Sequence, residues 1–318
     1  MHATILRWFR LTLRLQGSVI PSIINRVIWC GLFGALISAA HSFGLPMSQP
    51  VFGVVIPSIV LGLLLVFRTN TAYDRFWEGR KCWGNLVNHT RNLAWQIWVA
   101  VAELEPGDRV QKIAALRLLV AFAVATKLHL RSEPVNSELK DLVSDPEYLK
   151  LQKMNHPPLE IALSLGDYLQ QQSHRQALNT YQLTTLQGVL NKMVDSLGGC
   201  ERILKTPIPL AYAIHLKQLL LLYCLFLPFQ LVGELDWLTG PVVALISFTL
   251  FGIEEIGLEI EDPFGHDPND LPLDAICATM RRNIEDLIKF RPSVEFYPNN
   301  SNHLESLLAN SPDLEVGR

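Results

Sequence analysis

The sequence has little charge, few cysteines and no catalytic motif. Only 18% of its 318 residues are charged and the formal net charge is −3, so no basic field indicates a nucleic-acid partner. The five cysteines are scattered and form no C-x-x-C pair, which argues against a disulfide framework or a zinc site and predicts free thiols. There is no G-x-S-x-G elbow, Walker loop or H-E-x-x-H motif, so no residue pattern supports an enzyme.

What the chain does have is an apolar surplus of 49%, gathered in long runs. Four of these runs are Val27–Leu45, Val51–Phe67, Leu210–Val232 and Trp237 to about Ile253. Each approaches the roughly 20 residues that a helix needs to cross the hydrocarbon core of a bilayer. The alternative, buried helices of a soluble protein, is disfavoured by the charges that flank the runs. The sequence therefore predicts four transmembrane helices.

The flanking charges also predict an orientation. The connections Pro46–Pro50 and Gly233–Asp236 contain no lysine or arginine. Basic residues gather at the other ends of the spans, namely Arg7, Arg10, Arg14, Arg26, Arg68, Arg75, Arg80 and Lys81. By the positive-inside bias, both termini and the middle of the chain are expected on the cytoplasmic side, most simply of the plasma (inner) membrane.

The hydrophobic patterning predicts an all-α chain made of five consecutive parts. Residues 1–26 form an amphipathic N-terminal segment, 27–74 the first two spans, 75–207 a cytosolic helical region, 208–260 the last two spans, and 261–318 a cytosolic C-terminal segment and tail. Within the N-terminal segment, Ile5–Leu15 has the pattern of an interfacial helix, the alternative being a solvated face of a soluble helix. No small-residue cleavage site follows, so a removable signal peptide is not expected.

The cytosolic region reads as long amphipathic helices. An apolar run covers Ile113–Leu130, but Arg117 and Lys127 bracket a core too short to be a fifth span. A second helical pattern covers Leu159–Leu204, and the proline-containing break between the two runs, at 131–158, predicts a loop with a short helix. The polar tail beyond Pro292 is expected to lie on a surface or to be disordered.

Two blocks carry a family resemblance. The block R-T-N-T-A-Y-D-R-F-W-E-G-R-K-C-W-G (68–84) directly follows a hydrophobic run, and D-P-F-G-H-D-P-N-D-L-P-L-D (262–274) follows the fourth. Together with Ile-Pro-Leu at 208–210, they resemble the bestrophin family, in its short bacterial form, over about 7–290. The resemblance implies a homopentamer in a lipid bilayer, with one axial pore lined by the second span. It implies a passive ion channel for anions such as chloride or bicarbonate; the alternatives are a cation-selective channel and a non-conducting membrane scaffold.

The second span contains a candidate pore neck. Val55, Ile59 and Leu63 recur every fourth residue, so on a helix they form one stripe that drifts by only about 40° per step. In five copies they would stack as three apolar rings, the kind of constriction that gates by dewetting. They also align with the neck of the family, where many members have phenylalanine and this sequence has aliphatic residues. The alternative is plain helix packing or lipid contact.

Further candidate residues lie outside the neck. Arg68 is the best candidate for a charge near the permeation path. The alternative is structural: the alternating charges Arg68, Asp74, Arg75, Glu78 and Arg80 can pair along the helix or between subunits. Tyr181, with Leu178 and Gln182 as neighbouring alternatives, is a candidate for a second, cytosolic constriction.

An acidic group is the candidate metal site, although no cofactor is required. Glu259, Asp262, Asp267 and Asp270 offer oxygen ligands that suit calcium, and the resemblance implies that Asp267 and Asp270 match side-chain ligands of a calcium clasp in animal members. The alternative is that these residues only form turns. Zinc at His266 is poorly supported, because one histidine among oxygens is a poor zinc set.

Overall fold

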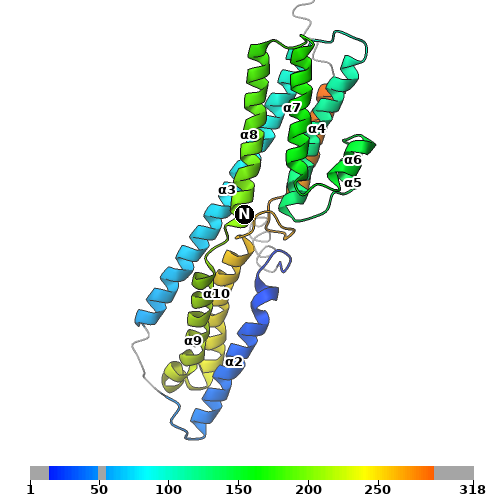
Figure 1. Ribbon diagram of the computed structural model, residues 1–318. Coiled ribbons are helices and arrows are strands. Elements are labelled where there is room, and N and C mark those ends of the chain that lie inside the picture. The colour runs from blue at the N-terminus through cyan, green and yellow to red at the C-terminus, as the bar shows by residue number, and fades with distance from the viewer. Residues whose placement is uncertain (1–13, 49–54, 290–318) are drawn as a thin grey trace, which may run out of the picture.

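The computed structural model describes residues 14–48 and 55–289, and every regular element in this part of the chain is a helix. In chain order the elements are α2 (Ile20–Ser42), α3 (Val55–Ala100), α4 (Asp108–Leu130), α5 (Ser137–Lys140), α6 (Asp145–Leu151), α7 (Pro157–His174), α8 (Thr180–Lys205), α9 (Leu210–Leu235), the short 3-10 helix η1 (Asp236–Leu238), α10 (Thr239–Glu259) and α11 (Leu273–Lys289). They form an elongated molecule of two bundles placed end to end (Figure 1). The predicted all-α class is confirmed.

The first bundle consists of α2, α9, α10 and the N-terminal part of α3. Its core is an apolar cluster of Ile23, Val27, Leu61, Leu65, Leu216, Leu220, Cys224 and Phe251. A Cβ atom added to Gly34 on α2 would lie only 3.1 Å from the Cα atom of Gly240 on α10. Such close approach through small residues is typical of helix packing in membranes, where lipid offers no hydrophobic driving force between helices.

The outer face of this bundle is strongly apolar. Trp29, Leu36, Phe226 and Leu245 are between 61% and 73% exposed in the single chain. Apolar side chains of this size on three neighbouring helices are more than a soluble surface normally carries. A hydrocarbon environment around the bundle accounts for them, because lipid covers apolar side chains without cost.

Three described stretches are long and apolar enough to cross a membrane: Ile20–Ser42, Asp108–Leu130, and Leu210–Glu259, which holds α9 and α10. In the most apolar part of the first and last, 28% and 22% of the residues are buried inside the subunit, against 72% in the second. The second stretch is α4, whose apolar surface is covered by other helices of the same chain. It is the central helix of the second bundle, where its apolar residues pack against protein.

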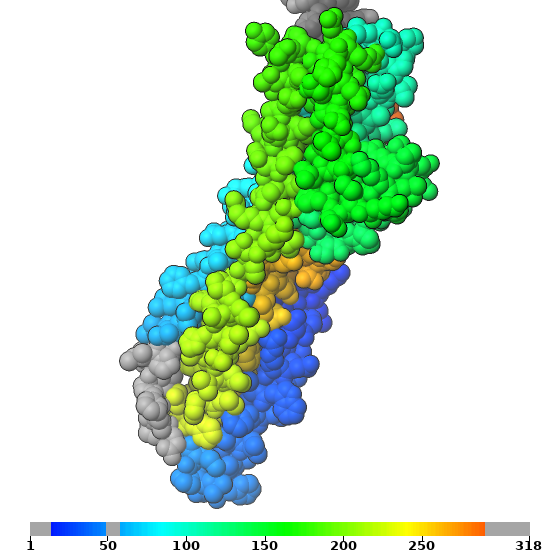
Figure 2. All heavy atoms as spheres, in the orientation of Figure 1, coloured from blue at the N-terminus to red at the C-terminus, as the bar shows by residue number. Residues whose placement is uncertain are grey.

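The second bundle packs α4, α7, α8 and α11 with the C-terminal part of α3. Its core is centred on fully buried side chains of four helices, among them Trp83, Leu93, Phe122, Leu165 and Met193. Helix α3 is 46 residues long and contributes to the cores of both bundles. It therefore runs through both bundles, while α8 and α9 follow one another along the molecule (Figure 2).

Several predicted boundaries are different in the structure. Helix α2 begins at Ile20, before the expected start at Val27. The pattern expected over Leu159–Leu204 is split into α7 and α8, because Gln176 adopts a φ of 60° and Asn179 caps the start of α8. The break before α7 contains two short helices, α5 and α6, where one was expected. The expected interfacial helix at Ile5–Leu15 and the polar tail beyond Pro292 lie outside the described residues.

Candidate functional site

Helix α3 has one face against its own subunit and one face exposed. Leu61, Leu65 and Arg68 are buried, with 2% to 3% of their surface exposed, whereas Ile59 and Leu63 are 56% and 53% exposed. Since each residue of a helix turns by about 100°, Ile59 lies on the side opposite Arg68. Two of the three predicted neck residues thus share the exposed face; the side chain of the third, Val55, lies outside the described residues.

The exposed face continues beyond the predicted neck with polar residues. Asn70 and Asp74 follow Ile59 by about three and four helical turns, and both are exposed, as is Lys81 further along. Sequence reasoning did not extend the stripe past Leu63 and so did not place Asn70 and Asp74 on it. The helical period that picked out Ile59 and Leu63 would have found them, because it does not depend on the side chains being apolar.

Arg68 faces the interior of the subunit. Its guanidinium Nη2 donates to Glu261 Oε2 over 3.0 Å, and only 2% of the side chain is exposed. The side chain packs against α10, where a Cβ atom on Gly257 would lie 3.5 Å from Arg68 Nε. Within one subunit, Arg68 therefore joins α3 to α10 and its charge points away from the exposed stripe.

Arg75, two turns further along α3, fastens the junction between the bundles. Its Nη2 donates to the carbonyl of Ile203 over 2.7 Å, its Nε donates to the carbonyl of Glu261 over 3.1 Å, and its Nη1 donates to the carbonyl of Thr206. These carbonyls lie at the ends of α8 and α10, where helices leave backbone acceptors without partners. One side chain thus joins three elements at the level where the second bundle begins.

Tyr181 is the second residue of α8 and is 87% exposed. Of its two neighbouring alternatives, Leu178 is 3% exposed, and Gln182 closes a capping box with Asn179. Among these three positions only Tyr181 therefore presents a large side chain that is free of contacts holding it to the subunit core.

The acidic group lies in the loop between α10 and α11 and at the end of α10. Asp270 Oδ2 accepts from the backbone N–H of Asp267 over 2.7 Å, and Asp262 Oδ1 accepts from that of Phe264 over 3.2 Å, which are turn-forming contacts. Asp270 Oδ1 is buried and has no hydrogen-bond partner among the described residues. Burial, together with the charges of Asp267 and Asp262, raises the pKa of Asp270 to about 6.

The fourth acidic residue, Glu259, accepts a hydrogen bond from the side chain of Asn269. Within the part of the chain that the structure describes, only one set of three His, Cys, Asp or Glu residues has ligand atoms within 4.8 Å of one another, and it lies elsewhere, at His129, His156 and Glu201. The acidic loop offers carboxylates on one segment without such convergence.

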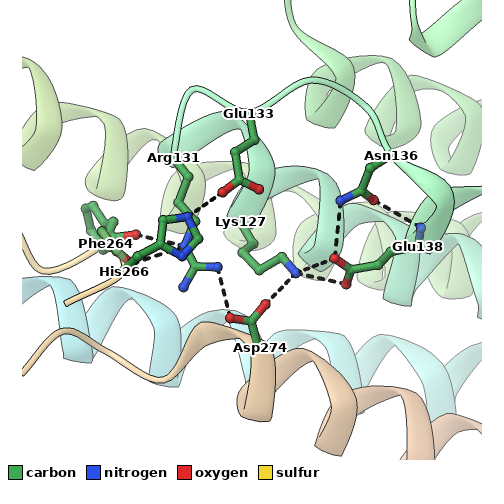
Figure 3. Close-up of polar contacts among 9 residues, drawn as sticks. Lys127, Arg131, Glu133, Asn136, Glu138, Phe264, His266 and Asp274 are labelled. Carbon is green, nitrogen blue, oxygen red and sulfur yellow. Dashed lines mark hydrogen bonds and ion pairs between the residues drawn. The ribbon is translucent and has the colours of Figure 1, made fainter. Parts of the chain in front are cut away.

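An ionic network around the buried side chains of Lys127 and Arg131 holds this loop against α4. Lys127 is 1% exposed, and its Nζ donates to Asp274 over 2.7 Å and to both oxygens of Glu138 over 2.8 Å (Figure 3). Arg131 donates from Nε to the carbonyls of Phe264 and Gly265 over 3.1 Å and from Nη1 to Asp274 over 2.9 Å. The network therefore joins α4, α5, the loop and α11.

The charges in this network stabilise one another. The hydrogen bond from Lys127, helped by Arg131, lowers the pKa of Asp274 to about 2. Burial alone would lower the pKa of Lys127, but the hydrogen bonds to Asp274 and Glu138 outweigh it and the pKa is raised. Sequence reasoning did not predict this network, because its partners lie up to 147 positions apart in the chain.

The apolar outer faces of α2, α9 and α10, together with a long α3 that extends into a helical bundle of different surface character, define an integral membrane protein. Comparison with known proteins identifies its family. The family model described as Bacterial/Fungal Bestrophin protein matches residues 1–286. The chain therefore belongs to the bacterial and fungal bestrophin family, and the resemblance found in the sequence is confirmed.

Several relatives are similar over nearly their whole length. A protein of Nostoc sp. named voltage-dependent anion channel-forming protein is 67% identical over 287 residues, which are 90% of this chain and 94% of the relative. A protein of the same description from Synechocystis sp. is 58% identical over 285 residues, covering 90% and 93%. The crystal structure of a mutant of a bacterial bestrophin homologue from Klebsiella pneumoniae superposes with a TM-score of 0.78 at 29% identity, covering 84% of this chain and 99% of that one.

Proposed function

We propose that this protein is the subunit of a channel that conducts anions passively across a membrane. The observation that carries the proposal is the face of α3 on which Ile59 and Leu63 are exposed, opposite the face that packs on the subunit. Anion channel formation is what the names of the Nostoc and Synechocystis relatives state. Aliphatic side chains repeated along a helix can form a hydrophobic constriction when several copies of the helix surround one axis.

The assembly that suits this role is a homopentamer with α3 nearest the axis. Tyr73 and Trp77 on α3 are 56% and 50% exposed in the single chain, which is a large apolar surface for a helix that leaves the bilayer. Contacts between subunits would cover such side chains. The proposed topology has four spans and both termini on the cytoplasmic side of the plasma (inner) membrane, in keeping with Arg26, Arg75 and Lys81 near the cytosolic ends of the spans.

An apolar neck does not select the sign of an ion; charged and polar rings near it do. On the exposed face of α3, Asn70 and Asp74 come after Leu63, and Lys81 lies two turns beyond Asp74. A ring of Lys81 would attract anions into the cytosolic part of the path, while a ring of Asp74 would favour cations. Asp74 is thus the specific observation in favour of the cation-selective alternative.

The decisive experiment is the reversal potential of the purified protein in planar bilayers under a KCl gradient. For an anion channel the reversal potential lies close to the chloride equilibrium potential, and it shifts when chloride is replaced by a large anion. A reversal near the potassium equilibrium potential would instead support the cation-selective alternative. Electrically silent protein that reconstitutes correctly would overturn the channel proposal and leave the scaffold alternative.

Two further parts of the proposal concern Tyr181 and the acidic loop. We propose that Tyr181 forms a second constriction at the cytosolic end of the path. We also propose that the acidic loop takes up a hard cation such as calcium by drawing its carboxylates together, because the orphaned Oδ1 of Asp270 would gain a partner and the nearby charge of Asp267 would be offset. Calcium should therefore raise the melting temperature of the wild type but not that of Asp270→Asn, and an equal effect on both would exclude the loop as the site.

A further inference from the structure

Three side chains from three helices meet at the end of the cytosolic bundle that lies near the membrane. His129 is in the last turn of α4, His156 is the N-cap residue of α7, and Glu201 is in the last turns of α8. The Nε2 atoms of His129 and His156 lie 2.7 Å and 2.8 Å from the same atom, Glu201 Oε1. The two imidazole rings are 4.5 Å apart between centroids.

The two histidines converge on one oxygen atom of Glu201 more closely than two separate hydrogen bonds would require. Both histidines direct the same ring nitrogen to one carboxylate oxygen, and all three ligand atoms lie within 4.8 Å of one another. Two imidazole nitrogens and one carboxylate are the donor set of an open zinc site, in which water or another ligand fills the remaining position. Hard cations such as magnesium prefer sites made of oxygen alone.

We propose that His129, His156 and Glu201 bind a divalent transition-metal ion of the zinc class. Side-chain exposures of 21%, 33% and 18% place the three residues at the surface of the bundle but half covered by it. His129 also lines a hollow of about 450 Å³ together with Pro157, Leu128 and Gln152. His156 and Glu201 do not line this hollow, so it lies beside the site on the side of His129.

The charges around the site are compatible with a cation. Glu201 supplies the carboxylate of the set, and its Oε1 atom lies within hydrogen-bond distance of both imidazoles. The opposing charge is Lys205, whose Nζ lies 3.7 Å from the other oxygen of Glu201. Because the Lys205 side chain is 68% exposed, it can move into solvent when a metal ion binds.

His156 links metal binding to the start of α7. Its Nδ1 accepts a hydrogen bond from the backbone N–H of Leu159 over 3.2 Å, so without metal the ring proton is on Nε2. A metal ion on Nε2 requires the proton to be on Nδ1, which can then no longer accept from Leu159. Metal binding therefore exchanges the N-cap hydrogen bond of α7 for a coordination site that joins α4, α7 and α8. Of the three ligands, Glu201 lies close to the end of α8, from which the chain leads into α9.

The test is zinc titration of the full-length, EDTA-treated protein by calorimetry, with magnesium as the comparison ion. We expect His156→Asn to lose one zinc equivalent per subunit, while keeping its thermal stability in EDTA because asparagine is itself a good N-cap residue. Glu201→Gln should lose the same equivalent. His174→Asn, on the exposed end of α7, is the matched control and should bind zinc as the wild type does.

The rate of amide hydrogen exchange at Leu159 is a second measurement, and it does not depend on channel activity. Zinc should accelerate exchange of the Leu159 amide in the wild type and leave it unchanged in His156→Asn. Equal zinc stoichiometry and affinity in the wild type, His156→Asn and Glu201→Gln would overturn the proposal. Zinc binding without any change at Leu159 would overturn coordination through Nε2 of His156.

Discussion

Arg68 donates to Glu261 over 3.0 Å from a side chain that is almost wholly buried, and this pair connects α3 to the segment that follows α10. Glu261 also accepts from the backbone N–H of Ile208, at the start of the segment that enters α9. The pair therefore fixes the helix that carries Ile59 and Leu63 relative to the rest of the first bundle. In this way, the orientation of the exposed stripe depends on a contact on the opposite side of the same helix.

Removing the acidic partner should destabilise the protein strongly. Glu261→Ala removes the carboxylate that forms an ion pair with the buried Arg68 guanidinium, which costs about 3 kcal/mol or more. The measurement is the melting temperature of the purified protein in detergent. The control is Asp141→Ala, which breaks the exposed pair with Arg281 and should cost less than about 1 kcal/mol. Equal losses in both variants would contradict the structural role of Arg68.

Shortening an exposed residue of the proposed neck should widen the path. Ile59→Ala removes part of one apolar ring, so single-channel conductance should rise severalfold, and the sign selectivity should stay the same because no charge changes. Val60→Ala is the matched control, since Val60 is 46% exposed but points about 100° away from Ile59. If both variants conduct like the wild type, the stripe does not face the permeation path.

Truncation of Tyr181 should alter permeation without altering stability. The side chain is 87% exposed, so Tyr181→Ala should change the free energy of unfolding by less than about 0.5 kcal/mol and leave the melting temperature nearly unchanged. If five copies narrow the cytosolic end, the variant should pass large anions relative to chloride more readily, as measured by bi-ionic reversal potentials. Leu163→Ala, an exposed apolar site on α7, serves as the control. Unchanged relative permeability in Tyr181→Ala would exclude the second constriction.

The Lys127 network should make stability depend on acid pH. The pKa of Asp274 is about 2 in the folded protein, below its ordinary value of 3.8, so the ionised carboxylate stabilises the fold. This contribution is present above about pH 4 and is lost as the pH falls from about 4 to about 2.

At pH 6, Asp274→Asn should have a lower melting temperature than the wild type. Near pH 2 the melting temperatures of the two proteins should be close. The expected difference is modest, because the Asp274 side chain is 66% exposed and solvent screens the interaction. The measurement is the difference between the two melting temperatures as a function of pH. A difference that stays constant from pH 6 to pH 2 would show that the charge of Asp274 contributes nothing.

Some of the molecule was determined by local sequence alone. The apolar runs that became α2, α9 and α10 were predicted from length and composition, since a span must be apolar over about 20 residues whatever its neighbours are. The family followed from two short blocks, at 68–84 and 262–274. That Ile59 and Leu63 lie on one side of a helix was also predicted, because it follows from the helical period; that this side is exposed in the subunit was decided by packing.

Only the tertiary structure decided the contacts between residues that are distant in the chain. Arg68 reads as a basic residue at a membrane boundary, yet it is buried, since Glu261 lies 193 positions away and supplies the counter-charge. In the sequence Lys127 lies near the end of an apolar run, yet in the structure it pairs inside the bundle with Asp274. His129, His156 and Glu201 share no sequence motif. Their convergence arises because α4, α7 and α8 end or begin at one level of the bundle, and no local pattern records which ends will meet.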